Sequence, residues 1–326
     1  MQDFSGYVDF YNNLDSFDTK FSGLNLVQRQ IALITSSSGG FEPGFIYLNR
    51  IFFDLGFTAL QFLTFITFFT NYFLLNFLSK YPRFTASLFF LISTQFFFQQ
   101  GNLVRQMFAI SILLNAIKYL YTRKLGLFAL LVILASSIHV GSMIFMSVYF
   151  FNSFYIKRVI LFIIWLCSVI IFYFPQLIPL DFGTFGIFFT KELIKNDSVG
   201  DLVHFNFIYN FVCLLFLISY EKISSLKEEK VLFLIFFVGV CLGNLVSISE
   251  WFYRISLYFL PTLIILLSKI YIPIKSIFRI NSKNNQIIVY SVVFLFLLFY
   301  PFRFVIFTNT TAIGKEVYSI SEFFRH

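Results

Sequence analysis

The sequence predicts an all-α membrane protein with many spanning helices, and three observations support this fold class. Hydrophobic residues make up 58% of the 326 residues and charged residues only 12%, with a mean hydropathy of +0.82, whereas a soluble domain carries about 25% charged residues. Apolar windows of about 17 to 25 residues recur along the chain, the length that crosses roughly 30 Å of hydrocarbon. The alternating ten-residue pattern of a membrane β-barrel is absent. We therefore expect a bundle of about ten transmembrane helices.

The predicted spans are separated mostly by short connections. They cover residues 57–78, 84–99, 104–121, 126–138, 140–153, 158–174, 205–220, 231–248, 253–270 and 286–305. Segment 126–153 is divided because a single helix would place the next basic loops on the opposite side of the membrane from the earlier ones. Dividing it at "SSIH" gives two short antiparallel helices that meet at His139, among small residues that suit close packing. Each is about 20 Å long at roughly 1.5 Å per residue, so we expect both to pack within protein or to line a cavity.

With this division the basic loop residues all fall on one side, which the positive-inside rule assigns to the cytoplasm. They are Lys80, Arg83, Lys118, Arg123, Lys124, Lys157, Arg158, Lys222, Lys227, Lys230, Lys275, Arg279 and Lys283. Arg105 and His139 then face the outer side. The basic residues lie in loops between spans, and no nucleic-acid motif is present. We therefore expect no nucleic-acid partner despite the net charge of +8.

We expect one transmembrane domain over residues 1–326. Residues 1–56 would form an outer-face segment with a short interfacial helix, residues 57–305 the helical bundle with an outer loop near 175–204, and residues 306–326 a tail. A start on the outer face would require about 50 residues to cross the membrane ahead of the first span. We therefore also expect that an N-terminal helix is missing or that the start codon is assigned too late.

Arg105 is the most unusual residue of the apolar segments. In "GNLVRQ", Asn102 is the expected N-cap and Arg105 the third helical residue, where a cation opposes the helix dipole. At the membrane centre an arginine would cost roughly 2.5 to 3.5 kcal/mol. An anionic ligand would relieve both penalties, because helix N-termini and guanidinium groups both bind phosphate. The alternatives are a carboxylate partner or a side chain that reaches the lipid headgroups.

Two further segments hold candidate polar residues, each with an alternative interpretation. His139, at the meeting point of the two short helices, is suited to accept a proton from an attacking hydroxyl or to make structural hydrogen bonds. In "SEWFYRISLYFLP", Glu250, Arg254 and Tyr258 follow at intervals of four on one helical face. They form either an internal ion pair or a second arm of an anion clamp.

The segment "GGFEPGFIYLNRIFFDLG" predicts a short helix on the outer membrane surface. Pro43 is placed to start this helix, and Arg50 and Asp54 lie four apart within it. Glu42 precedes the proline, where it either caps the helix or contacts a substrate. The chain has no P-loop, no dinucleotide fingerprint, no DxD-like cluster and no paired cysteine spacing, so we expect neither a metal nor another cofactor, and an energy-coupled pump is disfavoured.

Four segments together resemble a known family: "FEPGFIYLN", "RQMFAISI", "SSIHVGSMIF" and "YRISLYF", in this order and spacing. They resemble the EpsG-like polysaccharide polymerases, relatives of the Wzy-type O-antigen polymerases. The resemblance implies a glycosyltransferase of GT-C-like architecture in the bacterial inner membrane with a periplasmic active face. Its implied donor is an oligosaccharide linked to undecaprenyl pyrophosphate, its acceptor another lipid-linked repeat unit, and its further partners membrane lipid and a chain-length regulator.

The resemblance also assigns roles to residues. Pyrophosphate binding is assigned to Arg105, Arg254 and Gln106. Proton acceptance is assigned first to His139 and then to Glu250 or Glu42. Substrate contacts are assigned to Asn102, Arg50 and Tyr258. An O-antigen ligase, which differs only in its acceptor, stays open, whereas a flippase would distribute its charges through both halves of the membrane and a membrane acyltransferase would place its histidine beside a cytoplasmic entrance.

Overall fold

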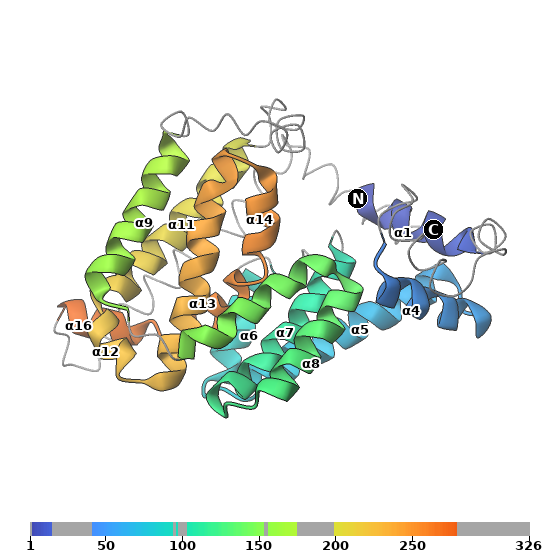
Figure 1. Ribbon diagram of the computed structural model, residues 1–326, viewed down its shortest axis with the longest axis horizontal. Coiled ribbons are helices and arrows are strands. Elements are labelled where there is room, and N and C mark those ends of the chain that lie inside the picture. The colour runs from blue at the N-terminus through green and yellow to red at the C-terminus, as the bar shows by residue number, and fades with distance from the viewer. Residues whose placement is uncertain are drawn as a thin grey trace. The chain divides into compact units, whose positions relative to one another are not determined.

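The computed structural model describes residues 2–14, 41–93, 96, 103–152, 156–174 and 199–278 of the chain. Every element within this part is a helix, and no strand occurs there (Figure 1). The described residues cluster into two compact units, one within Met1–Tyr119 and Lys124–Met143, the other within Leu120–Arg123 and Ile144–Tyr290. The all-α fold class is therefore confirmed.

The first unit is built around one buried helix. Its helices are α1 (Gln2–Asn12), α4 (Pro43–Asp54), α5 (Ala59–Leu78), α6 (Phe84–Ser93), α7 (Val104–Tyr121, whose last two residues cluster with the second unit) and α8 (Leu125–Ile138). Between Val104 and Ile117, every residue of α7 except Arg105 is buried, as expected for the core helix of a bundle. Around it, α4 packs on α8 and α5, and α1 packs on α5.

Local signals in the sequence explain where two of these helices begin. Thr58 and Gln61 form a capping box at the start of α5, in which the Thr58 hydroxyl accepts from the Gln61 N–H and the Gln61 side chain accepts from the Thr58 N–H. Pro43 opens α4, where its fixed φ suits the first helical position and its missing N–H costs no hydrogen bond.

The second unit surrounds α13, which is buried over most of its length. The elements are η2 (Val140–Asn152, which begins in the first unit), α9 (Arg158–Tyr173), α11 (Val199–Ile218), α12 (Tyr220–Ser224), α13 (Lys227–Asn244), η4 (Leu245–Ser247), α14 (Glu250–Ser256), η5 (Leu260–Thr262), α15 (Leu263–Ser268) and α16 (Tyr271–Phe278). Contacts with α9, α11, α14 and α15 place α13 at the centre (Figure 1). Gly239 allows its close approach to η5, because a Cβ there would lie 2.9 Å from the Phe259 Cβ.

The helix boundaries follow the predicted spans in most of the described chain. The predicted break at His139 is present, because α8 ends at Ile138 and His139 adopts an extended backbone (φ −148°, ψ 109°) before η2. The continuous helix predicted over 253–270 is wrong. Pro261 lacks an N–H and its ring clashes with the preceding helical turn, so the chain forms α14, η5 and α15 instead.

Two helices are long and apolar enough to cross a membrane, judged by length and composition. They are Ala59–Leu78 and Lys227–Ser247. Shorter apolar helices cover Leu125–Ile138, Val140–Phe151, Arg158–Tyr173 and Phe207–Ile218. The number of about ten transmembrane helices, and their GT-C-like arrangement, stay predictions. The predicted span 286–305, the loop from 175 to 198 and the tail 306–326 lie outside the described residues.

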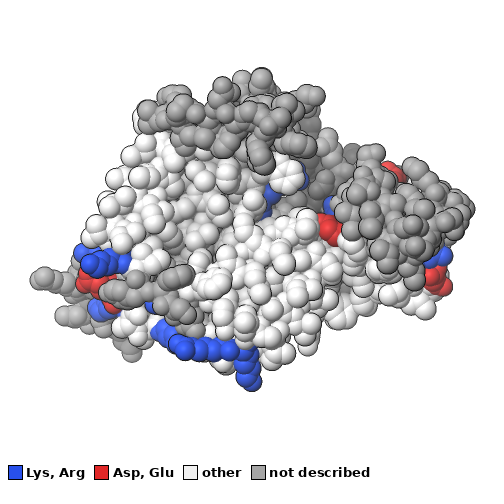
Figure 2. Space-filling model, in the orientation of Figure 1, with Lys and Arg blue, Asp and Glu red and all other residues white. Residues whose placement is uncertain are grey.

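Basic residues gather at helix ends in both units. In the first unit the Lys80 ammonium donates to the Asn115 Oδ1 over 2.7 Å, and Lys118 lies in the last turn of α7. Burial, together with the charge of Lys118, lowers the pKa of Lys80. In the second unit Arg158 lies 3.6 Å from Glu221 of α12. Figure 2 shows basic residues on the surface at α12 and at the turn that joins α7 to α8.

Candidate functional site

The residue before α4 contributes a carboxylate to the site. Glu42 stands at the N-cap position, with φ −74° and ψ 152°, and its backbone oxygen accepts the Ile46 N–H over 3.0 Å. Its side chain makes no capping hydrogen bond to α4, so the helix-cap interpretation of this carboxylate is wrong. The carboxylate reaches instead toward α7 and the start of η2.

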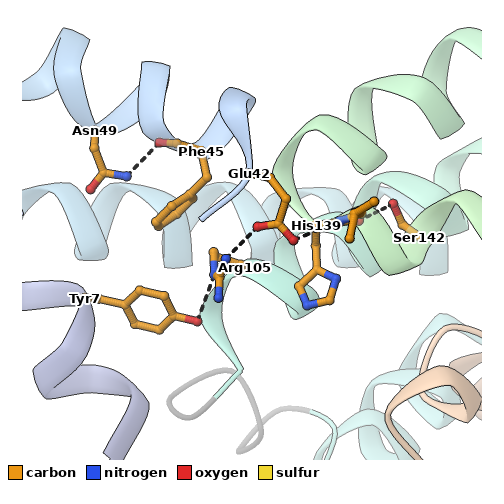
Figure 3. A network of polar contacts seen from close by, with 8 residues as sticks. Tyr7, Glu42, Phe45, Asn49, Arg105, His139 and Ser142 are labelled. Atoms are coloured by element: carbon orange, nitrogen blue, oxygen red, sulfur yellow. Dashed lines mark hydrogen bonds and ion pairs between the residues drawn. The ribbon is translucent and has the colours of Figure 1, made fainter. Parts of the chain in front are cut away.

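Glu42 and Arg105 form an ion pair that is largely protected from solvent. The Arg105 Nη1 lies 2.5 Å from the Glu42 Oε2, and the two side chains are 17% and 12% exposed. The other carboxylate oxygen, Oε1, accepts the Val140 N–H over 3.0 Å. One carboxylate therefore joins the start of α4, the first turn of α7 and the first residue of η2 (Figure 3).

Three aromatic rings surround the Arg105 guanidinium. Its Cζ lies 4.5 Å from the ring centre of Phe41, 5.5 Å from that of Tyr7 and 5.7 Å from that of Phe45. The Tyr7 hydroxyl also accepts from the Arg105 Nε over 3.3 Å (Figure 3). Such cation–π contacts contribute roughly 0.5 to 2 kcal/mol each, more where water is excluded. The rings therefore hold the guanidinium in place and strengthen its electrostatic interactions.

His139 is held beside this ion pair by the turn between α8 and η2. Its N–H donates to the Ala135 carbonyl over 2.9 Å, and its carbonyl accepts from both the N–H and the hydroxyl of Ser142, over 3.0 and 2.8 Å. In Figure 3 its imidazole lies below the Glu42 carboxylate, on the same side as the Arg105 guanidinium. The next residue, Val140, supplies the N–H that binds Glu42.

A glycine allows α4 to approach this turn. A Cβ on Gly44 would lie 2.4 Å from the Ser137 hydroxyl oxygen and 2.6 Å from the Ser137 carbonyl oxygen. A side chain larger than hydrogen at this position would push α4 away from α8. Gly44 is therefore the residue that places Glu42 within reach of Val140.

A family model covers nearly the whole chain. The match extends over residues 1–318 and is to the EpsG family. The chain belongs to the EpsG family. This confirms the resemblance carried by the four segments of the sequence. No curated protein and no solved structure shows a significant similarity to the chain. Membership indicates a membrane protein of polysaccharide biosynthesis with a polymerase-like, glycosyltransferase activity.

The first unit of this EpsG-family protein brings together three of the residues assigned from sequence: Glu42, Arg105 and His139. Gln106, the next residue on α7, is 3% exposed. Arg50 lies further along α4, where it forms a surface ion pair of 2.9 Å with Asp54.

Other assigned residues belong elsewhere. Asn102 lies outside the described residues, and α7 begins at Val104, so Arg105 is the second residue of the helix rather than the third. Arg254 is an exposed residue of α14 in the second unit. The expected shared face with Tyr258 is wrong, because α14 ends at Ser256 and the Tyr258 side chain is only 1% exposed.

Glu250, the remaining assigned residue, is the first residue of α14, after the N-cap Ser249. Glu250 belongs to the second unit, as Arg254 does. Within the described part of the chain, no three His, Cys, Asp or Glu side chains are placed as metal ligands are.

The EpsG-family site also contains residues that the sequence analysis missed. Tyr7, Phe41 and Phe45 form the aromatic surround of Arg105, and their rings contact one another at centroid distances of 5.7 to 5.8 Å. The position of Phe41 and Phe45 on either side of Glu42 was a usable signal. Tyr7 offered none, because it lies 98 residues from Arg105 in the chain.

Proposed function

We propose that this EpsG-family protein is a polysaccharide polymerase of the bacterial inner membrane. It transfers a growing glycan from undecaprenyl pyrophosphate to the outermost sugar of another lipid-linked repeat unit, on the periplasmic face. Family membership supports the reaction class. The main support for the proposal is one observation: Arg105 and the Val140 N–H each bind one oxygen of the Glu42 carboxylate.

The leaving group of this reaction is a pyrophosphate, whose negative charge grows as the glycosidic bond breaks. A guanidinium and a backbone N–H that already point at a common anion are suited to stabilise this charge, and such fixed donors contribute several kcal/mol to transition-state stabilisation. The aromatic rings of Tyr7, Phe41 and Phe45 keep the guanidinium oriented. We assign pyrophosphate binding to Arg105 on this basis.

The periplasmic orientation is supported by the charge distribution along α7. Arg105 lies in the first turn of this helix and Lys118 in the last, which separates their Cα atoms by roughly 20 Å at 1.5 Å per residue. Lys80 lies near Lys118, and basic residues mark the cytoplasmic side of a membrane protein. Arg105, Glu42 and His139 then face the periplasm.

The attacking hydroxyl of the acceptor sugar has to lose a proton as its oxygen bonds to the anomeric carbon. His139 is our first choice for the proton acceptor because the N–H of the next residue, Val140, is one of the anion-binding donors. Arg254 and Glu250 of the second unit remain proposed contributors, the arginine as a further contact to pyrophosphate. Gln106 remains a proposed contact to pyrophosphate, and Asn102, Arg50 and Tyr258 remain proposed substrate contacts.

The proposal is tested by the length of the surface glycan in cells that lack the chromosomal copy. These cells receive the wild-type protein, Arg105→Ala, Arg105→Lys or the control Asp54→Asn. The Asp54 carboxylate is exposed at the end of α4, the helix that follows Glu42. We expect both Arg105 variants to produce glycan of a single repeat unit, because the point charge of lysine does not replace a guanidinium fork. A normal ladder from membrane-expressed Arg105→Ala would contradict the proposal.

A further inference from the structure

We propose that Glu42 occupies the pyrophosphate site when no donor is bound, and that its carboxylate and the donor pyrophosphate exchange during each catalytic cycle. This inference rests on the proposed function, because it concerns the same donors. We call the Arg105 guanidinium and the Val140 N–H the donor pair. The proposal makes Glu42 an internal competitor of the substrate rather than a permanent part of its binding site.

The contacts of Glu42 are those that a phosphate group would make. Both carboxylate oxygens are used, one by a charged donor at 2.5 Å and the other by a backbone N–H at 3.0 Å. Charge-assisted bonds from arginine and bonds from backbone N–H groups are both established ways in which proteins bind phosphate oxygens. The carboxylate makes no capping bond to its own helix, so α4 does not depend on it for an N-terminal hydrogen bond.

The electrostatics of the donor pair favour one anion at a time. Arg105 lies in the first turn of α7, where the helix dipole opposes a cation, and its side chain is only 17% exposed. An anion at this position therefore stabilises the arginine. A carboxylate and a pyrophosphate bound together would repel each other strongly in such a partly desolvated place. Binding of the pyrophosphate consequently requires Glu42 to leave.

The exchange needs only a movement of the Glu42 side chain. Pro43 and the first turn of α4 hold the backbone of Glu42, and the close contact of Gly44 with Ser137 keeps α4 against α8. Rotation about the side-chain torsions would withdraw the carboxylate while the donor pair stays in place. After glycan transfer, return of the carboxylate would displace the undecaprenyl pyrophosphate product, so Glu42 would weaken product binding.

Competition of this kind makes a clear prediction about binding affinity. A ligand that must displace an internal group binds with an affinity reduced by the fraction of protein in which the site is free. Glu42→Gln keeps the shape of the side chain and removes its charge, so it should bind a polyprenyl diphosphate about ten-fold more tightly than wild type. If Glu42 instead only orients Arg105, the same substitution would loosen the guanidinium and weaken binding.

The experiment titrates the full chain, purified in lipid nanodiscs, with farnesyl diphosphate as the probe. Wild type, Glu42→Gln, Arg105→Gln and Asp54→Asn are compared by calorimetry. Asp54→Asn is the matched control, because it removes one carboxylate from the surface ion pair of α4 and should bind as wild type does. We expect tighter binding by Glu42→Gln and loss of binding by Arg105→Gln.

The outcomes separate the exchange from the proposed function. Unchanged or weaker binding by Glu42→Gln, with Arg105→Gln still defective, would overturn the exchange and leave the proposed function standing. Wild-type binding by Arg105→Gln, or no binding by any protein including wild type, would overturn the proposed function and the exchange with it. If Glu42→Gln does not fold, Glu42→Asp replaces it. The shorter carboxylate reaches the donor pair less well, so it too should bind the probe more tightly than wild type, and equal or weaker binding would overturn the exchange.

Discussion

The Arg105 guanidinium and the Glu42 carboxylate meet in an ion pair although the two residues lie 63 positions apart in the chain. The pair connects the first turn of α7 to the residue that precedes α4. Removing Arg105 leaves the Glu42 carboxylate largely buried and without this ion pair, and breaking an ion pair in a protein interior costs about 3 to 5 kcal/mol. Single substitutions at this pair therefore change both stability and chemistry, and experiments on the site have to separate the two.

Gly44→Ala should weaken the protein and its activity together. The new Cβ would meet the Ser137 hydroxyl and carbonyl at 2.4 and 2.6 Å, and the carbonyl belongs to backbone that cannot move aside easily. Overpacking of this kind costs about 1 to 3 kcal/mol, and it moves Glu42 away from Val140. Thermal unfolding in detergent and glycan ladder length measure the two effects. Gly126→Ala is the control, because nothing lies within 4 Å of its Cβ, and equal behaviour of the two variants would contradict the prediction.

Val140→Pro tests the backbone N–H of the donor pair. Proline removes this donor, is tolerated at the first position of a helix, and is preceded by His139, whose extended backbone suits a residue before proline. We expect glycan polymerisation to fall about 100-fold, as observed when one fixed oxyanion donor is lost. Val140→Ala keeps the N–H, and the removed atoms are largely exposed. Equal activities of the proline and alanine variants would show that the N–H does not act on the substrate.

Asn244→Ala should lower stability without changing the chemistry. Asn244 accepts from the Asn210 side chain over 2.7 Å and donates to the Ser168 hydroxyl over 2.9 Å, and Asn210 accepts from the Trp165 indole over 2.8 Å. Loss of this link between helices should reduce the free energy of unfolding by about 1 to 2 kcal/mol. Asn71→Ala, on the surface of α5, is the control. A loss of polymerisation per folded molecule would instead place Asn244 in the reaction.

Much of the fold could be predicted from sequence because lipid imposes strong rules on length and charge. The apolar windows located α5, α7 and α9 within a few residues. The distribution of basic loops located the break at His139, where hydropathy alone would have predicted one continuous helix. The predicted helix over 253–270 failed because its average hydropathy concealed Pro261, a local backbone effect that a window average does not detect.

The candidate site was predictable only in part. Arg105 and His139 stood out because polar residues are rare beside apolar helices. Glu42 could not be identified from sequence as the partner of Arg105. Their pairing depends on how α4 packs against α8, through the contact of Gly44 with Ser137. Tyr7 was missed for the same physical reason, since a contact between segments far apart in the chain leaves no periodic trace in either one.

The most direct test of the account is a neutral replacement of the ion pair, Arg105→Gln combined with Glu42→Gln. The double variant removes both charges of the pair, so it should be expressed and folded as well as wild type. If Arg105 binds pyrophosphate, cells carrying this variant will produce surface glycan of only one repeat unit, as expected for Arg105→Ala. A normal glycan ladder from the folded double variant would show that Arg105 serves only to neutralise Glu42, and would contradict the central claim.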